Sequence, residues 1–484
     1  MSEAVRNLEP KIVWNHFADL NAVPRPSKKE ERVIQFMVDF GKKLNLDTLV
    51  DKVGNVIIKK PATNGFENRK TLVLQSHLDM VHQKNNDTVF DFDKEGIKML
   101  VDRDWVKADG TTLGADNGLG VAAIMAILSS DDIQHPNIEA LFTIDEETGM
   151  TGAMGLEGGI LKGDILLNLD TEEDDEIGMG CAGGIDVTAT RKYIEENVSE
   201  NSIAYKIQVK GLNGGHSGMD IIKGLGNANK LMNRIHFSAI NAIQICEIDG
   251  GSLRNAIPRE STSIITTDKK NDRFVEFSFL SEIEKIKAEF ITLEPNLEII
   301  FSSTQVPKKS LNLSTSKSLI KSIYAALNGV YRMSPDIDGL VETSNNIARV
   351  IVKDGVIKIG CLTRSSSKSN KLDLANSLKS AFELAGFDVE FSGEYPGWQP
   401  NVKSEILDIV ANLYEKLHGE KANVAACHAG LECGILGQNY PKMDMVSFGP
   451  NIKGAHSPDE RAQISSTQKF WKFLVEILKN IPKK

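Results

Sequence analysis

The feature that most constrains the fold of this chain is an apolar run that ends in two potential metal ligands. Residues Thr71–Leu74 have the pattern of a buried strand, and His77 and Asp79 follow where that strand ends. In an open α/β sheet, ligands bind at the carboxyl ends of the strands. A neutral imidazole suits zinc, and a nearby carboxylate commonly orients it. Since a lone His–Asp pair is more often hydrogen-bonded without a metal, its interpretation depends on what ends the other strands.

Length and composition restrict the class of protein. A chain of 484 residues is too long for one hydrophobic core, so two or more domains are expected. The formal net charge of -10 argues against a nucleic-acid-binding protein, which would carry a basic surface. The first residues lack the layout of a signal peptide, no apolar run is long enough to span a membrane, and the cysteines are scattered. These features predict a cytoplasmic protein with reduced thiols.

Strand and helix patterns alternate along the first part of the chain, which predicts a sheet with helices on its faces. Ser27 is a candidate cap for the second helix, and Val106–Gly114 has the composition of a turn-rich approach to the third. Expected strands are Asn55–Lys59, Thr71–Gln75, Ile138–Asp145 and Asp164–Leu169, and expected helices are Ile12–Leu20, Glu30–Leu44 and Leu119–Leu128.

The middle of the chain has the pattern of an inserted domain. Gly178–Gly184 is glycine-rich and predicts a hinge. After it come two successive sets of strands and helices with a similar plan, including a helix expected near Ile221–Ile235. The expected division is therefore a discontinuous domain of residues 1–183 and 399–484 and an inserted α+β domain of residues 184–398 with two similar halves.

Two histidines and three carboxylates stand at the ends of predicted strands or just after them: His77, Asp116, Glu147, Asp170 and His456. This set suits a pair of divalent ions, because one carboxylate can bridge and leave each ion one histidine and one terminal carboxylate. Each residue also has a simpler interpretation. Asp116 is a candidate helix cap, Glu147 and Asp170 are candidate solvated strand ends, and His456 is a candidate surface histidine.

Further candidates accompany this set. Glu146 is the remaining carboxylate, able to move a proton beside two cations, although an exposed Glu–Glu pair is the alternative. Cys427, His428 and Cys433 lie close together in the sequence, but their spacing matches no common zinc motif and favours small buried cysteines.

At this point the chain resembles the co-catalytic zinc peptidases related to aminoacylase and glutamate carboxypeptidase. The resemblance rests on motifs that occur in the same order over almost the whole chain. They are His77–Val81, Gly114–Gly118, Asp145–Gly149, Leu169–Glu172, Gly214–Gly218, Leu253–Pro258, Leu362–Ser366 and Gly454–Glu460. It implies an α/β catalytic domain with a mixed central sheet flanked by helices, and an inserted α+β lid domain.

The resemblance also implies roles for single residues. One metal would be held by His77 and Asp170, a second by Glu147 and His456, and both by Asp116. Glu146 would be the general base for a hydroxide that bridges the metals, and Asp79 the second catalytic carboxylate, which orients His77. In the lid, His216 would stabilise the oxyanion, and Asn255 and Arg364 would bind the substrate carboxylate.

The implied activity is hydrolysis of unblocked dipeptides, with Xaa-His, including β-alanyl-histidine, as the substrate class. The metals would be two divalent ions, zinc first, with cobalt or manganese as alternatives. The insert is about twice as long as in the short-lid relatives, so His216 is expected to act within its own chain, in a monomer or a homodimer. An N-acyl amino-acid deacylase and a non-catalytic metal- or peptide-binding protein remain alternatives, and the acidic net charge disfavours a two-metal phosphatase or nuclease.

Overall fold

The computed structural model describes residues Ser2–Lys484 and divides the chain into two compact units. Unit 1 contains the chain up to Gly180 together with Trp398–Ala426 and Leu431–Lys484. Unit 2 contains Cys181–Gly397 and Cys427–Gly430. Among the described residues, no helix is long and apolar enough to cross a membrane.

Unit 1 is built around a mixed eight-stranded sheet, as the sequence predicts. The strands, in sheet order, are β1 (Asp47–Val50), β2 (Val56–Lys60), β6 (Ile138–Thr143), β3 (Leu72–His77), β7 (Ile165–Asn168), β23 (Asp444–Ser447), β8 (Glu176–Cys181) and β22 (Asn423–Cys427). The central strands β6, β3, β7 and β23 pair in parallel, whereas β1, β2 and β8 pair antiparallel with their neighbours. The carboxyl ends of the parallel strands therefore meet at one edge.

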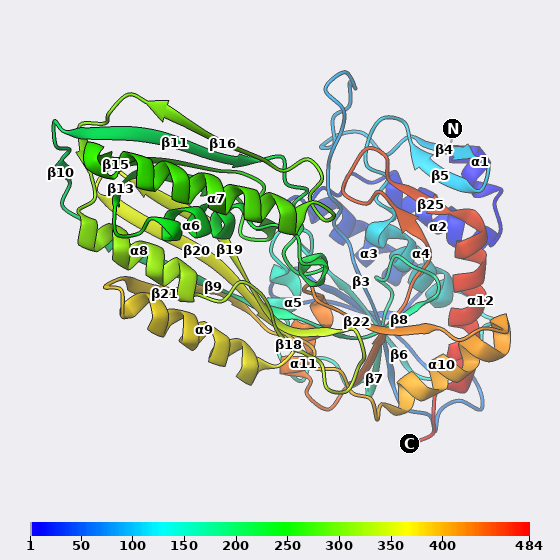
Figure 1. Ribbon diagram of the computed structural model, residues 1–484. Coiled ribbons are helices and arrows are strands. Elements are labelled where there is room, and N and C mark those ends of the chain that lie inside the picture. The colour runs from blue at the N-terminus through cyan, green and yellow to red at the C-terminus, as the bar shows by residue number, and fades with distance from the viewer. Residues whose placement is uncertain (1) are drawn as a thin grey trace. The chain divides into compact units, whose positions relative to one another are not determined.

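Helices cover both faces of this sheet (Figure 1). On one face, α4 (Ala115–Ser129) packs against β3, and α2 (Lys11–Asn21) packs on α4. On the other, α5 (Thr151–Gly155) and α11 (Glu432–Asn439) enclose a core that includes Val73, Leu141 and Leu166. The remaining helices of the unit are α1 (Ser2–Arg6), α3 (Glu31–Lys43), α10 (Glu405–His418) and α12 (Ile464–Asn480). Both faces of β3 are buried, which explains its nearly continuous apolar run.

A second, four-stranded sheet lies in unit 1 and was not predicted. Its order is β24 (Ile452–Lys453), β25 (Arg461–Gln463), β5 (Trp105–Ala108) and β4 (Met99–Asp102). The sequence predicted only a turn-rich segment around Val106–Gly114, but β5 forms the start of that segment. Such short, partly exposed strands give little periodic signal. This sheet matters for the site because the loop between β24 and β25 carries His456.

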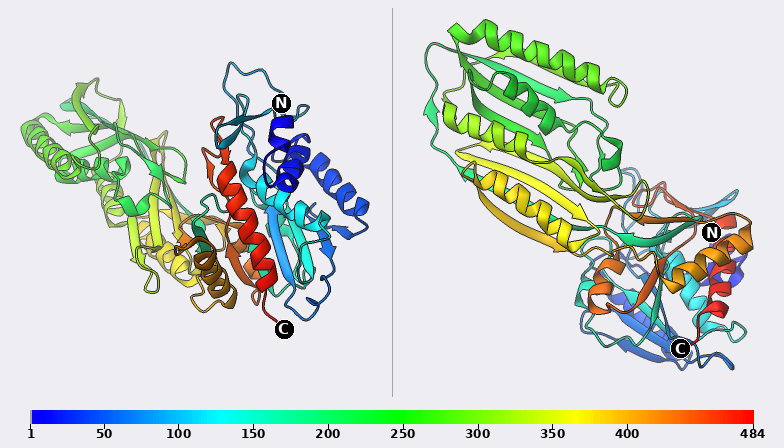
Figure 2. Two further views of the ribbon diagram at one scale, coloured as in Figure 1. Left: turned by 90° about the vertical axis from the view of Figure 1, so that its right-hand side faces the viewer. Right: turned by 60° about the horizontal axis from the view of Figure 1, so that its bottom comes forward.

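Unit 2 contains a single nine-stranded antiparallel sheet. Its order is β16 (Glu298–Thr304), β11 (Ser202–Lys210), β15 (Ser261–Asp268), β13 (Ile243–Gly251), β19 (Val341–Lys353), β20 (Val356–Ser365), β9 (Gly183–Lys192) and β21 (Asp388–Tyr395), with β18 (Gly329–Met333) also paired to β19. Its helices α6 (Ala228–Ser238), α7 (Asp272–Phe290), α8 (Leu313–Ala325) and α9 (Lys368–Glu383) lie along one face (Figures 1 and 2). One large apolar core fills the space between these helices and the sheet.

The glycine-rich segment Gly178–Gly184, expected as a hinge, is where the chain passes from unit 1 to unit 2 after Gly180, and its residues are paired in β8 and β9. Two local predictions were wrong. The helix expected near Ile221–Ile235 is a short 3-10 turn, Ile221–Lys223, followed by α6, which Asn227 caps. Ser27 caps no helix, since its hydroxyl donates to Asp79 Oδ2 over 2.8 Å.

Candidate di-metal site

The parallel strands deliver three of the predicted side chains to one edge of the sheet in unit 1. His77 is the last residue of β3, Glu147 follows β6, and Asp170 follows β7. The other two predicted ligands come from elements outside the sheet. Asp116 lies in the first turn of α4, and His456 lies in the loop between β24 and β25. The structure brings all five together.

Asp116 is at the centre of the group. Its Oδ1 lies 3.1 Å from His77 Nε2, and its Oδ2 lies 3.3 Å from His456 Nε2. The backbone of Asp116 is not helical, with φ of -79° and ψ of 112°. Both oxygens of its carboxylate are turned toward histidines, as expected for a ligand.

Each histidine also faces a second carboxylate. His77 Nε2 lies 3.5 Å from Asp170 Oδ1, and His456 Nε2 lies 2.9 Å from Glu147 Oε2. The ligand atoms of His77, Asp116 and Asp170 lie within 4.8 Å of one another, and so do those of Asp116, Glu147 and His456. These two groups share Asp116 and have the residue types that hold divalent transition metals. Neither group includes a cysteine.

An orphaned oxygen supports the fit to cations. Glu147 Oε1 is buried and has no hydrogen-bond partner among the described residues. An unpaired buried carboxylate oxygen is costly unless a cation or a donor compensates it. A metal ion near His456 would satisfy this oxygen together with Oε2.

The charges of the site also fit bound cations. Burial, together with the neighbouring Asp116 and Glu147 carboxylates, raises the pKa of Asp170 to about 6 against the opposing effect of His77. Hydrogen bonds that His456 donates to the Asp116 and Glu147 carboxylates raise the pKa of His456 to about 11. Divalent ions bound among these side chains would keep every carboxylate ionised and the histidines neutral.

Asp79 supports His77 from behind. Asp79 Oδ1 lies 3.3 Å from His77 Nδ1 and accepts the backbone N–H of Glu146 over 3.0 Å. Asp79 Oδ2 accepts from Ser27 Oγ and, over 3.3 Å, from the N–H of Glu147. Burial opposes ionisation, but these donors and the His77 ring lower the pKa of Asp79 to about 2. An ionised Asp79 therefore fixes both the His77 ring and the turn that carries Glu146.

Glu146 lies beside this group with different electrostatics. Its ligand atom lies within 4.8 Å of those of His77 and Glu147. Burial raises the pKa of Glu146 well above its ordinary value, and Asp170, Glu432 and Glu147 raise it further against the opposing effect of His77. A carboxyl group with a raised pKa in this position can accept a proton and release it again.

Glu432, at the start of α11, was not predicted from the sequence. Its buried Oε2 accepts from Gln75 Nε2 over 2.6 Å and from Thr143 Oγ1 over 2.7 Å. Burial raises the pKa of Glu432 to about 7. This side chain joins β3 to β6 below the ligand edge, and no sequence motif marks it because its partners are 357 and 289 residues away.

The predicted lid residues lie in unit 2, where His216 and Arg364 are neighbours. His216 Nδ1 accepts the N–H groups of Gly218 and Met219 over 3.3 and 3.1 Å, so the ring proton is on Nε2. That Nε2 lies 3.4 Å from Arg364 Nη2, which is also a donor. Burial and Arg364 both lower the pKa of His216, which keeps the ring neutral. Two donors that converge in this way have room for a shared acceptor, such as an anionic oxygen.

The other predicted lid residue is less constrained. Asn255 is exposed, and its carbonyl accepts the N–H of Ser217 over 2.8 Å. This bond holds the segment of Asn255 against that of His216, and the same two segments pair as short antiparallel strands, Gly215–His216 with Ala256–Ile257. Arg364 is additionally held by Tyr395, whose hydroxyl accepts from Arg364 Nη1 over 2.6 Å. The sequence did not single out Tyr395.

The fold is that of a known class of hydrolase. The sequence model described as "Peptidase family M20/M25/M40" matches residues 73–480, and the chain belongs to this family. The chain is 44% identical over 488 aligned residues to the cytosol non-specific dipeptidase of Escherichia coli (strain K12), with 100% of both chains covered. The aligned region thus includes both units.

Solved structures agree with this relationship. The crystal structure of aminoacylhistidine dipeptidase from Vibrio alginolyticus has a TM-score of 0.94 and 44% identity to this chain, with 100% of both chains covered. The structure of aminopeptidase PepT from Bacillus cereus has a TM-score of 0.57 at 16% identity, covers 98% of this chain and 99% of its own, and shows the fold alone. The fold class expected from the sequence is thereby confirmed.

Proposed function

We propose that this chain is a metal-dependent dipeptidase that hydrolyses unblocked dipeptides of the Xaa-His class, including β-alanyl-histidine. The observation that carries the proposal is the geometry of Asp116, whose two oxygens face two separate histidine–carboxylate pairs beside Glu146. Family membership and full-length similarity to a dipeptidase support the same reaction class.

Two divalent ions fit the site, with zinc as the first candidate and cobalt or manganese as alternatives. His77 and Asp170 would hold one ion, Glu147 and His456 the other, and Asp116 both. Bound there, the ions would polarise the scissile carbonyl and make water acidic enough to react near neutral pH.

Glu146 is proposed to move the proton in this reaction. Its carboxylate takes a proton from the attacking water and delivers it to the amine that leaves. The raised pKa of Glu146 suits both steps. Because of it, the ionised carboxylate accepts a proton from water more readily, and the carboxylic acid that results can still give the proton to the amine. Asp79 acts through His77 and the Glu146 backbone, which it holds in place.

The lid residues are proposed to bind the oxygens of the substrate. His216 Nε2–H would stabilise the developing oxyanion, and Arg364 and Asn255 would bind the terminal carboxylate. His216 Nε2–H and Arg364 Nη2 are two donors 3.4 Å apart that can share one substrate oxygen, whereas Arg364 Nη1 already donates to Tyr395. Unit 2 would then be the lid domain, and recognition of the carboxylate would limit substrates to short peptides.

Replacing Arg364 by lysine tests the carboxylate role. We expect Arg364→Lys to lower kcat/KM for dipeptides by about 10- to 100-fold, because a charged hydrogen bond contributes about 1.5–3 kcal/mol. On dipeptide amides, which lack the terminal carboxylate, wild type and variant should be similarly slow. Arg349→Lys, on the neighbouring strand β19, is the control. An equal loss on dipeptides and on their amides would contradict the assignment.

A substrate panel separates this function from its nearest rival, an N-acyl amino-acid deacylase. Free dipeptides, their N-acetylated forms and N-acetyl amino acids are compared by kcat/KM with the metal content fixed. Preference for free dipeptides is expected. Preference for N-acetyl amino acids would establish the deacylase, and inactivity on all of them with both ions bound would favour a non-catalytic binding protein.

A further inference from the structure

We propose that two buried charged residues, Arg25 and Glu460, are positioning residues that set the spacing of the loops bearing the metal ligands. This inference rests on the proposed metal site but concerns residues whose hydrogen bonds, within the described part of the chain, go to no side chain of a proposed ligand. Arg25 and Glu460 are 1% and 2% exposed, and both direct their hydrogen bonds mainly at backbone groups of the site.

Glu460 links the His456 loop to the Asp116 turn. Glu460 Oε2 accepts the N–H groups of Leu113 and Gly114 over 2.7 and 2.9 Å. Glu460 Oε1 accepts those of Ala115 and Asp116 over 2.7 and 3.3 Å. One carboxylate thus receives four successive backbone donors that precede the regular part of α4, and a carboxylate at the start of a helix is favoured electrostatically.

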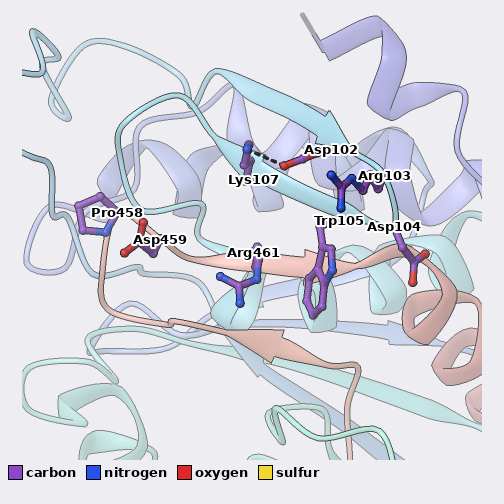
Figure 3. Close-up of a pocket in the computed structure, with 8 residues that line it drawn as sticks. All are labelled: Asp102, Arg103, Asp104, Trp105, Lys107, Pro458, Asp459 and Arg461. Atoms are coloured by element: carbon purple, nitrogen blue, oxygen red, sulfur yellow. Dashed lines mark hydrogen bonds and ion pairs between the residues drawn. The ribbon is translucent and has the colours of Figure 1, made fainter.

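The neighbours of Glu460 point the other way. Asp459 and Arg461 are exposed and line a hollow of about 520 Å³ on the small sheet, where the Arg461 guanidinium lies 5.1 Å from the centre of the Trp105 ring (Figure 3). Of these three consecutive residues only Glu460, directly before β25, is buried. Glu460 is therefore not part of this charged surface, and its partners are the backbone N–H groups of the Asp116 turn.

Arg25 links the Asp116 turn to the end of β3. Arg25 Nη1 donates to the carbonyls of Leu78 and Asp79 over 3.0 and 3.1 Å, and Nη2 donates to the carbonyl of Gly114 over 2.6 Å. The rigid guanidinium fork can bridge two segments in this way, whereas a lysine ammonium could not reproduce the geometry.

Glycines on both sides of Asp116 make room for Arg25. A Cβ atom at Gly114 or at Gly118 would lie 2.6 Å from Arg25 Nη2. Gly114 also has a φ of 69°, which favours glycine. Part of the glycine pattern around Asp116 is thus explained by the close passage of the guanidinium group rather than by contact with a ligand.

Burying these two charges is costly, so their placement calls for a compensating role. Each ion loses several kcal/mol of hydration on burial, and an apolar side chain would fill the same space without that loss. Unlike apolar side chains, Arg25 and Glu460 fix the distances between the backbone segments to which they bond. Arg25 sets Asp116 relative to His77 and Asp79, and Glu460 sets Asp116 relative to His456, so together they control the spacing of both ligand groups.

The test compares Glu460→Gln with a matched control, Glu139→Gln. Glu139 is 4% exposed at the start of β6, and its Oε2 accepts the N–H groups of Lys162 and Gly163 over 2.7 and 2.9 Å. Zn²⁺ affinity of the metal-free full-length proteins is measured by competition with a chromophoric chelator. We also measure the thermal unfolding of the same metal-free proteins and the visible absorption spectrum of the Co²⁺-loaded proteins.

We expect Glu460→Gln to weaken Zn²⁺ binding by about 10- to 100-fold and to change the Co²⁺ spectrum, because supporting residues of metal sites have effects of this size. Glu139→Gln should lower Tm but leave affinity and spectrum unchanged. Arg25→Lys should behave like Glu460→Gln and carries the test if that variant does not fold.

Wild-type Zn²⁺ affinity within twofold and an unchanged Co²⁺ spectrum in a folded Glu460→Gln or Arg25→Lys protein would overturn the inference. An equal loss of affinity in Glu139→Gln would overturn it too, since the effect would then follow from stability alone. If the wild type binds two ions but hydrolyses no dipeptide, the proposed activity fails while the positioning role stands. If the wild type binds no divalent ion, both fail.

Discussion

Replacing Glu146 by glutamine is expected to lower kcat for dipeptide hydrolysis by about 10²- to 10⁴-fold while both metal ions stay bound. General acid–base catalysis by one side chain has this magnitude. The amide keeps the size of the carboxyl group but accepts no proton. Steady-state hydrolysis of a free Xaa-His dipeptide, with metal content measured on the same sample, checks the prediction.

The control for this variant is Glu157→Gln, an exposed glutamate of the same unit that pairs only with Lys52. That protein should keep wild-type kcat. If Glu146→Gln with full metal content turned over dipeptides at the wild-type rate, Glu146 would not be the base. If it lost its metal ions as well, the residue would act in the ligand shell instead.

Replacing the shared carboxylate should have the second large effect. We expect Asp116→Asn to bind at most one divalent ion per chain tightly and to lose activity by at least about 10³-fold. Asp116 is the only proposed ligand that belongs to both groups, and metal-ion catalysis contributes several kcal/mol to the barrier. Metal analysis after dialysis and steady-state rates measure the two effects.

Asp170→Asn is the comparison for Asp116→Asn, because Asp170 belongs to one ligand group only. The Asp170 variant should retain the ion held by Glu147 and His456. Two tightly bound ions in Asp116→Asn would contradict the shared role of Asp116, and so would a smaller loss of metal in that variant than in Asp170→Asn.

The candidate site was largely predictable because its ligands stand where strands end. The apolar runs before His77, Glu147 and Asp170 are buried on both faces and therefore have a strong sequence signal. Parallel strands then bring their carboxyl ends to one edge of the sheet. The sequence pattern therefore predicts that the residues after these strands lie close together. Asp116 and His456 were grouped with these strand ends from the sequence, but neither follows a strand of the main sheet: Asp116 lies in the first turn of α4 and His456 in the loop between β24 and β25.

The residues that support the ligands were not predictable in the same way. Arg25 bonds to Gly114, 89 residues away, and Glu460 to Leu113, 347 residues away. Nothing in the local sequence of either residue indicates a buried charge, and lone Arg and Glu residues are usually exposed. Ser27 shows the same limit, because its local pattern suggested a helix cap while the folded chain places Asp79 within hydrogen-bond distance.

Weak strands and glycine-rich strands account for most of the differences between the expected and the observed fold. The strands β4 and β5 have only four residues each and are partly exposed, so their periodic signal is small. Gly178–Gly184 has a composition typical of a hinge, but long-range pairing with β20 and β23 holds its residues in strands. In both cases tertiary contacts outweigh local preference.

The most direct test of the central claim is metal titration of hydrolysis. Metal-free wild-type protein is titrated with Zn²⁺, Co²⁺ or Mn²⁺ while hydrolysis of β-alanyl-histidine is followed. The expected result is no activity without metal and a rise that reaches its maximum at two equivalents per chain. Hydrolysis that persists in fully metal-free protein would contradict the proposal, as would no hydrolysis of any free dipeptide with two ions bound.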